Sequence, residues 1–306
     1  MRQHASASNA AHVDKQHHRH VHAIAPKLGA MSVLVSAEEL HEKIHRGDKL
    51  TLLATTWVPG QGNSFRQFRA GHIPTAQHVN PATTLAGLPG SKAGRNPLPD
   101  PARLQANVNR WGLREDRPVV VYDDGQGFFA GRAWWVLRWA GIKNVSILDG
   151  GLAQWHRAGF DTMCGPGNIA MGSALTIRPG SMPAATIDEV HNFDGTLVDT
   201  RSFWRYSGRQ ENLDLKAGHI PGAVNASMRD LLTPNRLAKS KEEIRDVFAQ
   251  AGVTRGEGTV FYSGSGNHSG LALALAEHAG ITGASHYVGG WSQWSANAAN
   301  PVETSR

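Results

Sequence analysis

The sequence is poor in cysteine and in long apolar runs. Cys164 is the only cysteine among 306 residues, which excludes an internal disulfide framework and favours a reducing compartment. No apolar run approaches the roughly 20 residues that a membrane-spanning helix needs. We therefore expect a cytoplasmic protein without a membrane-spanning segment.

The sequence also lacks a block of basic residues. The formal net charge is +6 and the isoelectric point is about 9.7, a balance that could indicate a nucleic-acid partner. The Lys and Arg residues are scattered among Asp and Glu, however, with no basic block and no interleaved aromatic residues. We expect no nucleic-acid partner, and a mildly basic surface that attracts small anions.

The first 30 residues show no apolar periodicity of a helix or a strand. They hold six of the 16 histidines and no apolar core of signal-peptide length. We expect residues 1–30 to be a disordered leader, with Met31 as a candidate start of the folded protein. The alternative is a metal site at the histidines of positions 17, 18, 20 and 22. We favour the leader and expect no metal.

The rest of the chain contains one long repeat. Three landmark segments occur twice in the same order, and an apolar run precedes the first of them each time. An ordered repeat of this kind indicates two copies of one domain. The pairs are "AGHIPTAQHVN" (70–80) with "AGHIPGAVNAS" (217–227), "VVVYDDGQGFFAGRAWW" (119–135) with "TVFYSGSGNHSGLAL" (259–273), and "LDGGLAQW" (148–155) with "YVGGWSQW" (287–294).

Each copy alternates short apolar strands with helical stretches, among them amphipathic helices predicted at 100–112 and 240–252. This order predicts an α/β fold of two tandem domains, each a parallel sheet with helices on both faces. We expect a first domain at 31–160, a linker rich in Gly, Pro and Ser at 161–183, and a second domain at 184–306. Ligands of such sheets bind beyond the carboxyl ends of the strands.

The loop "SGSGNH" lies at such a strand end, after Tyr262. Its residues Gly264, Ser265 and Gly266 have small side chains, so their backbone amides can turn toward one point and form a nest for an anion. A βα turn that needs glycine for its geometry is the alternative. The spacing matches neither the dinucleotide fingerprint, nor the phosphate-binding loop of NTPases, nor the nucleophile elbow of hydrolases.

Together these segments resemble the tandem-domain rhodanese family, the thiosulfate and 3-mercaptopyruvate sulfurtransferases. The resemblance rests on the repeated "GHIP" motif, on "VFYSGSGNHSG", on "EEIRDVF" and on "LDGGLAQW", and it covers roughly residues 31–302. It implies transfer of sulfane sulfur to a thiol or cyanide by a nucleophilic cysteine that opens the loop of the second copy and becomes a persulfide. It further implies a small anionic sulfur donor, a thiol acceptor and no cofactor.

Ser263 stands where the resembled family has this cysteine. A nest of amides can draw a thiol with a pKa near ~8.5 to its thiolate, whereas a serine hydroxyl is a far weaker acid and forms no persulfide. Cys164 lies in the linker and offers no replacement. We therefore expect a sulfurtransferase relative without activity. The alternatives are a module that binds an anion or a partner, and a hydrolase with Ser263 as nucleophile and His268 as base, for which no third orienting group is visible.

The resemblance assigns further residues to the site. Ser265 matches the serine of the Cys-Gly-Ser-Gly loop in the mercaptopyruvate branch, and we count it with Ser263 as a catalytic candidate. A substrate arginine that the family has six residues before the second "GHIP" glycine is absent, because Asn212 stands there. The remaining loop residues are Gly264, Gly266, Asn267 and His268, and the substrate-binding candidates are Arg205, Arg201 and His72.

Two of these candidates have a structural alternative. Arg201 could form an ion pair with Asp199, and His72 could stabilise its own loop, as we expect of His219 in the second copy. In the first copy the loop opens with Asp123, whose carboxylate would repel an anionic donor. We interpret the basic and aromatic residues after it as structural packing, namely Arg132, Trp134 and Trp135.

Overall fold

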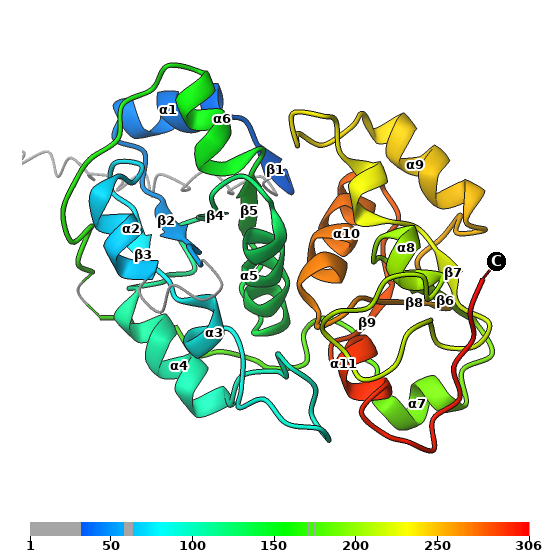
Figure 1. Cartoon of the computed structure of the whole chain (residues 1–306). Helices are drawn as coiled ribbons and strands as arrows, with labels where there is room; N and C mark the ends of the chain where they lie inside the picture. The colour runs from blue at the N-terminus through cyan, green and yellow to red at the C-terminus, as the bar shows by residue number, and fades with distance from the viewer. Residues whose placement is uncertain (1–31, 58–63, 171, 174, 306) are drawn as a thin grey trace, which may run out of the picture.

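A computed structural model describes residues 32–57, 64–170, 172–173 and 175–305. The predicted leader at 1–30 lies outside these residues. The described chain forms two α/β domains, which Figure 1 shows side by side, and each is built on its own parallel sheet. Over the same described ranges, none of the helices has the length and apolar character needed to cross a membrane.

The first sheet has five parallel strands in the order β1-β5-β4-β2-β3. Parallel neighbours need crossover connections, and helices supply most of them. The strands are β1 (Leu34–Val35), β2 (Thr51–Ala54), β3 (Gln77–His78), β4 (Val119–Tyr122) and β5 (Val145–Leu148), and the helices are α1 (Ala37–His45), α2 (Ser64–Ala70), α3 (Pro81–Thr84), α4 (Pro101–Arg110), α5 (Phe128–Trp139) and α6 (Gly151–Arg157).

The second sheet repeats this arrangement with four strands in the order β7-β6-β8-β9, which matches β3-β2-β4-β5. The register also repeats, because Ala54 lies opposite Tyr122 as Asp199 lies opposite Tyr262. The predicted α/β fold of two tandem domains is thus confirmed. The strands are β6 (Thr196–Asp199), β7 (Val224–Asn225), β8 (Thr259–Tyr262) and β9 (Ser285–Tyr287), and the helices are α7 (Ile187–His191), α8 (Phe203–Tyr206), the 3-10 helix η1 (Met228–Leu231), α9 (Lys241–Gln250), α10 (Asn267–His278) and α11 (Gly290–Trp294).

Both faces of each sheet are buried. In β4, Val119 and Val121 pack into one apolar cluster, whereas Val120 and Tyr122 pack into another on the opposite face. The cluster around Val121 also contains Phe261 of β8, so one continuous core runs through both domains. Strands buried on both faces explain the uninterrupted apolar runs in the sequence.

The predicted amphipathic helices are observed as α4 and α9. Each buries two apolar residues four positions apart, Leu104 with Val108 and Ile244 with Phe248. Residues with this spacing lie on one face of a helix. At the start of α9 the Ser240 hydroxyl and the Glu243 carboxylate cap each other's backbone amides, so the sequence "SKEE" marks the first turn.

Helices α5 and α10 join the two domains along their lengths (Figure 1). They approach closely because glycines face each other. A Cβ atom on Gly131 would lie 2.5 Å from the Cα atom of Leu271, and one on Gly270 would lie 3.0 Å from the carbonyl oxygen of Gly131. These positions exclude side chains and bring the N-termini of both helices to the same boundary between the domains.

We expect Gly131→Ala to destabilise the protein by about 1–3 kcal/mol, since the added methyl group would overpack the contact between α5 and α10. Urea unfolding would measure the loss as a lower midpoint. Gly90→Ala is the matched control, because a Cβ atom there meets no atom within 4 Å. Equal midpoints for the two variants would contradict the close-packing argument.

Candidate active site at the Ser263 loop

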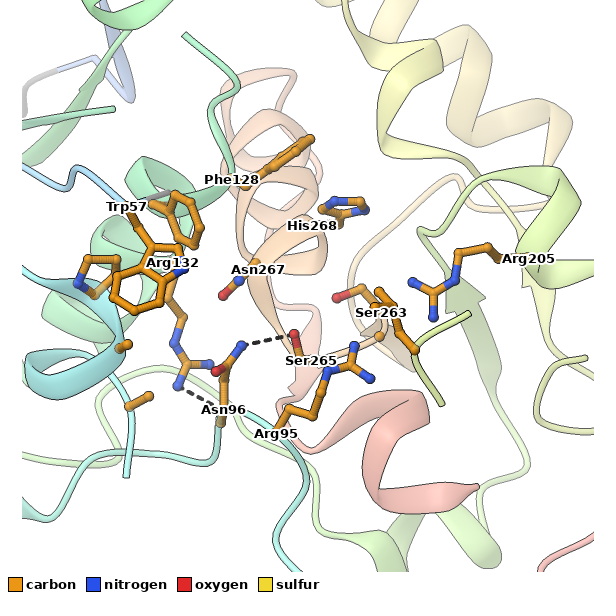
Figure 2. Close-up of a pocket in the computed structure, with 16 residues that line it drawn as sticks. Trp57, Arg95, Asn96, Phe128, Arg132, Arg205, Ser263, Ser265, Asn267 and His268 are labelled. Carbon is orange, nitrogen blue, oxygen red and sulfur yellow. Dashed lines mark hydrogen bonds between the residues drawn. The ribbon is translucent and has the colours of Figure 1, made fainter. Parts of the chain in front are cut away.

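The loop after β8 opens into a cavity of about 400 Å³ that both domains line (Figure 2). The second domain supplies the Ser263 loop and the N-terminus of α10. The first domain supplies the opposite wall from the segment before α4 and from the start of α5. The labelled lining residues are Trp57, Arg95, Asn96, Phe128, Arg132, Arg205, Ser263, Ser265, Asn267 and His268.

Ser263 is buried, with 1% of its surface exposed. Its Oγ accepts the amide of Gly266 at 3.1 Å and shares a hydrogen bond with the Ser269 hydroxyl at 3.1 Å. Ser269 in turn bonds Nε2 of His286 at 2.7 Å. A chain of three buried side chains therefore runs from the loop into the core behind it.

The start of helix α11 binds the backbone of the Ser263 loop through hydrogen bonds. The amide of Trp291 donates to the carbonyl of Ser263 at 2.8 Å, and that of Ser292 donates to the carbonyl of Gly264 at 2.9 Å. Gly290 makes this approach possible: its φ is +56°, and a Cβ atom there would lie 2.2 Å from the Ser263 carbonyl oxygen. The second glycine of "YVGGW" is thus required for the close contact between α11 and the Ser263 loop.

The first domain shows how such a loop binds an anion. The Asp123 carboxylate accepts four backbone amides at 2.9–3.3 Å, those of Gly125, Gly127, Phe129 and Ala130. The sequence predicts that this carboxylate repels an anionic donor, and that stays a prediction. The structure adds that it fills the anion position itself and satisfies the N-terminus of α5.

In the second domain the equivalent amides have no such acceptor. His268 and Ser269 occupy the second and third positions of α10, as Phe129 and Ala130 do in α5. Their amides donate to no acceptor among the described residues. The Ser263 hydroxyl takes only the amide of Gly266, in a loop that is one residue shorter. The N-terminus of α10, whose Asn267 and His268 line the cavity, therefore keeps amide donors without an acceptor.

Each domain contributes an arginine to the cavity, Arg95 from the first and Arg205 from the second. Asp214 accepts hydrogen bonds from Arg95 and from Arg205, and Glu211 accepts from Arg205 at 2.8 and 2.9 Å. Burial lowers the pKa of Arg95, and the neighbouring charge of Arg205 lowers it further. Two guanidinium groups and two carboxylates thus form a compact network beside Gly264.

Arg132 also lines the first-domain wall of the cavity. The sequence predicts only a packing role for this residue. Its Nη2 donates to the carbonyls of Leu85, Asn96 and Pro97 at 2.9–3.1 Å. Its Nη1 is buried and has no partner among the described residues, and burial lowers its pKa to about 10. A Cβ atom on Gly266 would lie 2.8 Å from this Nη1, which places a free donor beside the loop.

The structure brings most of the predicted site residues together. Ser263, Gly264, Ser265, Asn267, His268 and Arg205 line the cavity, and Gly266 supplies the amide bonded to Ser263. The residues that sequence reasoning missed come mainly from the first domain, above all Arg95 and Asn96. Nothing in their local sequence marks them, because only the docking of the domains carries them to the loop.

Two predicted substrate residues lie elsewhere. Arg201 is fully buried, pairs with Asp199 at 2.6 Å and stacks on Trp291 at 4.7 Å from the ring centroid. His72 stacks on Phe68 at 4.1 Å and bonds the carbonyl of that residue at 2.9 Å. Neither lines the cavity, so the geometry fits the structural alternative for both.

The two histidines near Ser263 are poor proton acceptors. His268 packs on Phe128 at 4.2 Å and makes no hydrogen bond with Ser263. Burial lowers the pKa of His268 to about 4, with a further contribution from the charge of Arg205. Burial also lowers the pKa of His286 well below its usual value, and Arg132 adds to that. Both rings are neutral at neutral pH.

The described residues contain no group of three His, Cys, Asp or Glu side chains placed to hold a metal ion. The histidine cluster at positions 17, 18, 20 and 22 lies outside the described residues.

Comparison with known proteins agrees with this geometry. The model of the rhodanese-like domain matches the chain twice, at residues 36–158 and 183–297. The chain belongs to the rhodanese family.

Relatives of this rhodanese-family chain are named as sulfurtransferases. It is 34% identical over 274 residues to a putative thiosulfate sulfurtransferase, SseB, of Mycobacterium tuberculosis, covering 88% of this chain and 96% of that protein. It is 36% identical over 282 residues to a probable 3-mercaptopyruvate sulfurtransferase of Pseudomonas aeruginosa, covering 89% and 98%. Both matches extend across the two domains.

Solved structures show the same fold. SseA from Escherichia coli, described as a 3-mercaptopyruvate sulfotransferase with the rhodanese fold, superposes with a TM-score of 0.74 at 27% identity, covering 86% of this chain and all of that one. The 3-mercaptopyruvate sulfurtransferase from Leishmania major gives a TM-score of 0.79 at 24% identity, covering 89% and 76%, and supports the fold alone.

We expect the protein to lose stability as the pH falls below about 6.5, because burial lowers the pKa of His286 in the folded state while the unfolded chain binds the proton. Above pH 6.5 the neutral form has no cost. His286→Gln removes this titration and can still bond Ser269. The difference in melting temperature between pH 7 and pH 5 should therefore be smaller in the variant. An unchanged difference would show that His286 does not contribute.

Proposed function

We propose that the Ser263 cavity binds a small oxyanion and that this chain, with serine at position 263, does not carry sulfur as a persulfide. The observation that carries the proposal is the pair of loops. In the first domain the amides at the start of α5 hold the Asp123 carboxylate, and in the second the corresponding amides of His268 and Ser269 have no acceptor among the described residues, at a helix start whose His268 lines the cavity. The relatives are named for thiosulfate and 3-mercaptopyruvate, both of them anions.

The chemistry of sulfur transfer needs a sulfur nucleophile. A thiolate attacks the outer sulfur of thiosulfate, so that a new sulfur–sulfur bond forms, the sulfur–sulfur bond of the donor breaks and sulfite leaves. With 3-mercaptopyruvate it attacks the thiol sulfur, the carbon–sulfur bond breaks, and the enolate that leaves takes up a proton to give pyruvate. The Ser263 hydroxyl is held by the Gly266 amide and by Ser269, but its oxygen forms no persulfide. On this proposal, the chain binds anions that resemble the sulfur donors but does not take their sulfur.

A serine hydrolase has less support from the geometry. His268 makes no hydrogen bond with Ser263, and the chain through Ser269 ends at His286, where burial and Arg132 oppose a positive charge. A general base needs a pKa near the working pH. The anion-binding module is thus the stronger candidate. A thiol acceptor, which the family implies, would apply only to a chain with cysteine at position 263. A cytoplasmic location completes the proposal, because the chain has one cysteine.

Two substitutions of Ser263 test the anion site. Ser263→Asp places a carboxylate beside the free amides, as Asp123 does in the first domain, so we expect thiosulfate binding to weaken about tenfold or more through occupation and charge repulsion. Ser263→Ala removes only the hydroxyl and should leave binding within about twofold, because the donors are backbone amides. Isothermal titration calorimetry measures both. Equal affinities of the two variants would overturn the proposed site.

Restoring the thiol should restore the chemistry. We expect Ser263→Cys to gain one sulfur atom from thiosulfate or 3-mercaptopyruvate, since the Gly266 amide and the Ser269 hydroxyl can stabilise the thiolate. Intact-mass spectrometry reads the gain, with the native chain as the unmodified control. Adding Ser269→Ala should raise the pKa of the new thiol and slow the gain. A folded Ser263→Cys chain that stays unmodified with both donors would contradict a latent sulfurtransferase site.

A further inference from the structure

The segment at 90–97 of the first domain crosses the boundary and lies against the Ser263 loop and α11. Its contacts are specific: the Arg95 amide donates to the Ser292 hydroxyl at 3.0 Å, and Nδ2 of Asn96 donates to Oγ of Ser265 at 2.9 Å. Nε2 of Gln293 donates to the carbonyl of Lys92 at 2.7 Å. The backbone of Arg95 is therefore fixed on the second domain.

The side chains of Arg95 and Arg205 both approach the Ser263 loop (Figure 2). A Cβ atom on Gly264 would lie 3.0 Å from Nη2 of Arg95 and 3.3 Å from Nη1 of Arg205. Two guanidinium groups thus flank the residue that follows Ser263. Asp214 and Glu211 offset the charge of these groups, so an anion beside Gly264 would be bound mainly by hydrogen bonds from the guanidinium nitrogens that face it.

Asp214 fixes both groups through one terminal nitrogen of each and leaves the other terminal nitrogen without a partner in the part of the chain that the structure describes. It accepts Nη1 of Arg95 and Nη2 of Arg205. The other terminal nitrogens, Nη2 of Arg95 and Nη1 of Arg205, are the atoms beside Gly264, and they have no acceptor among the described residues. The Asp214 side chain is 3% exposed and that of Arg95 is 35% exposed. The carboxylate that binds both guanidinium groups is therefore buried, whereas Arg95 stays accessible to a ligand.

Among residues 184–305 of the second domain, Arg205 is the one Lys or Arg that lines the Ser263 cavity. Asn212, where a substrate arginine was expected, lines a neighbouring cavity with Trp204 and Arg229 and does not line the Ser263 cavity. Arg201 is buried in its pair with Asp199. The positive charge that accompanies Arg205 at Gly264 therefore comes from the other domain.

We propose that Arg95 is a specificity-determining residue of the Ser263 cavity. Together with Arg205, Arg95 binds the oxyanion group of the ligand. This inference rests on the proposed anion-binding function and adds that recognition is shared between the domains. The two free nitrogens suit a carboxylate or a sulfonate-like group, which accept hydrogen bonds from two guanidinium donors. The ligand is thus held only when the domains are docked.

The test is titration calorimetry of the full chain with thiosulfate and, separately, with 3-mercaptopyruvate. We expect Arg95→Gln to weaken binding about tenfold or more, the usual effect of losing a charge-assisted hydrogen bond. Arg95→Lys keeps the charge and should recover part of the affinity. Lys92→Gln is the matched control, because it removes a positive charge from the same segment, where only the backbone carbonyl makes a contact. Affinity for one anion alone would show which oxyanion the pair selects.

Salt dependence separates a binding role from a structural one. If Arg95 contacts the anion, affinity should fall less steeply with rising salt in Arg95→Gln than in the native chain, while the melting temperature stays close to native. Native-like affinity of Arg95→Gln, or equal losses in Arg95→Gln and Lys92→Gln, would overturn the assignment and leave the proposed function intact. No binding of either anion by the native chain would overturn both.

Discussion

The close contact of α5 with α10 is the constraint on which the rest of the structure depends. Gly131 and Gly270 let the two helix backbones meet, and the apolar cluster that surrounds them includes strands of both sheets. Because both helices begin at the boundary between the domains, their N-termini and the loops before them share one region. The cavity at Ser263 exists there because the first domain closes it.

The two loops at this boundary differ in what accepts the backbone amides at the start of the helix that follows. A helix N-terminus presents amides without partners, and these favour negative charge. In the first copy Asp123 meets the amides from within the chain. In the second copy Ser263 is neutral and takes one amide, and the amides of His268 and Ser269 have no acceptor among the described residues. The anion site that we propose is thus the counterpart of the position that Asp123 fills in the first copy.

Local patterns explain why the fold and the loop could be predicted. Apolar strands, the spacing of Leu104 with Val108, and the cap at Ser240 all act over a few residues, so they are visible in the sequence. The repeat then fixes their order twice. The position of Ser263 after a parallel strand follows from the same pattern, since the carboxyl ends of such strands form ligand sites.

The sequence by itself thus determined the two α/β domains, the strand-end loop and the serine at its start. Only the tertiary structure decided which charges surround that loop. It placed Arg201 in the core, brought Arg95 across from the other domain, and linked Ser269 to His286. These contacts join residues from different elements through the docking of α5 on α10, and local sequence spacing carries no information about such long-range approach.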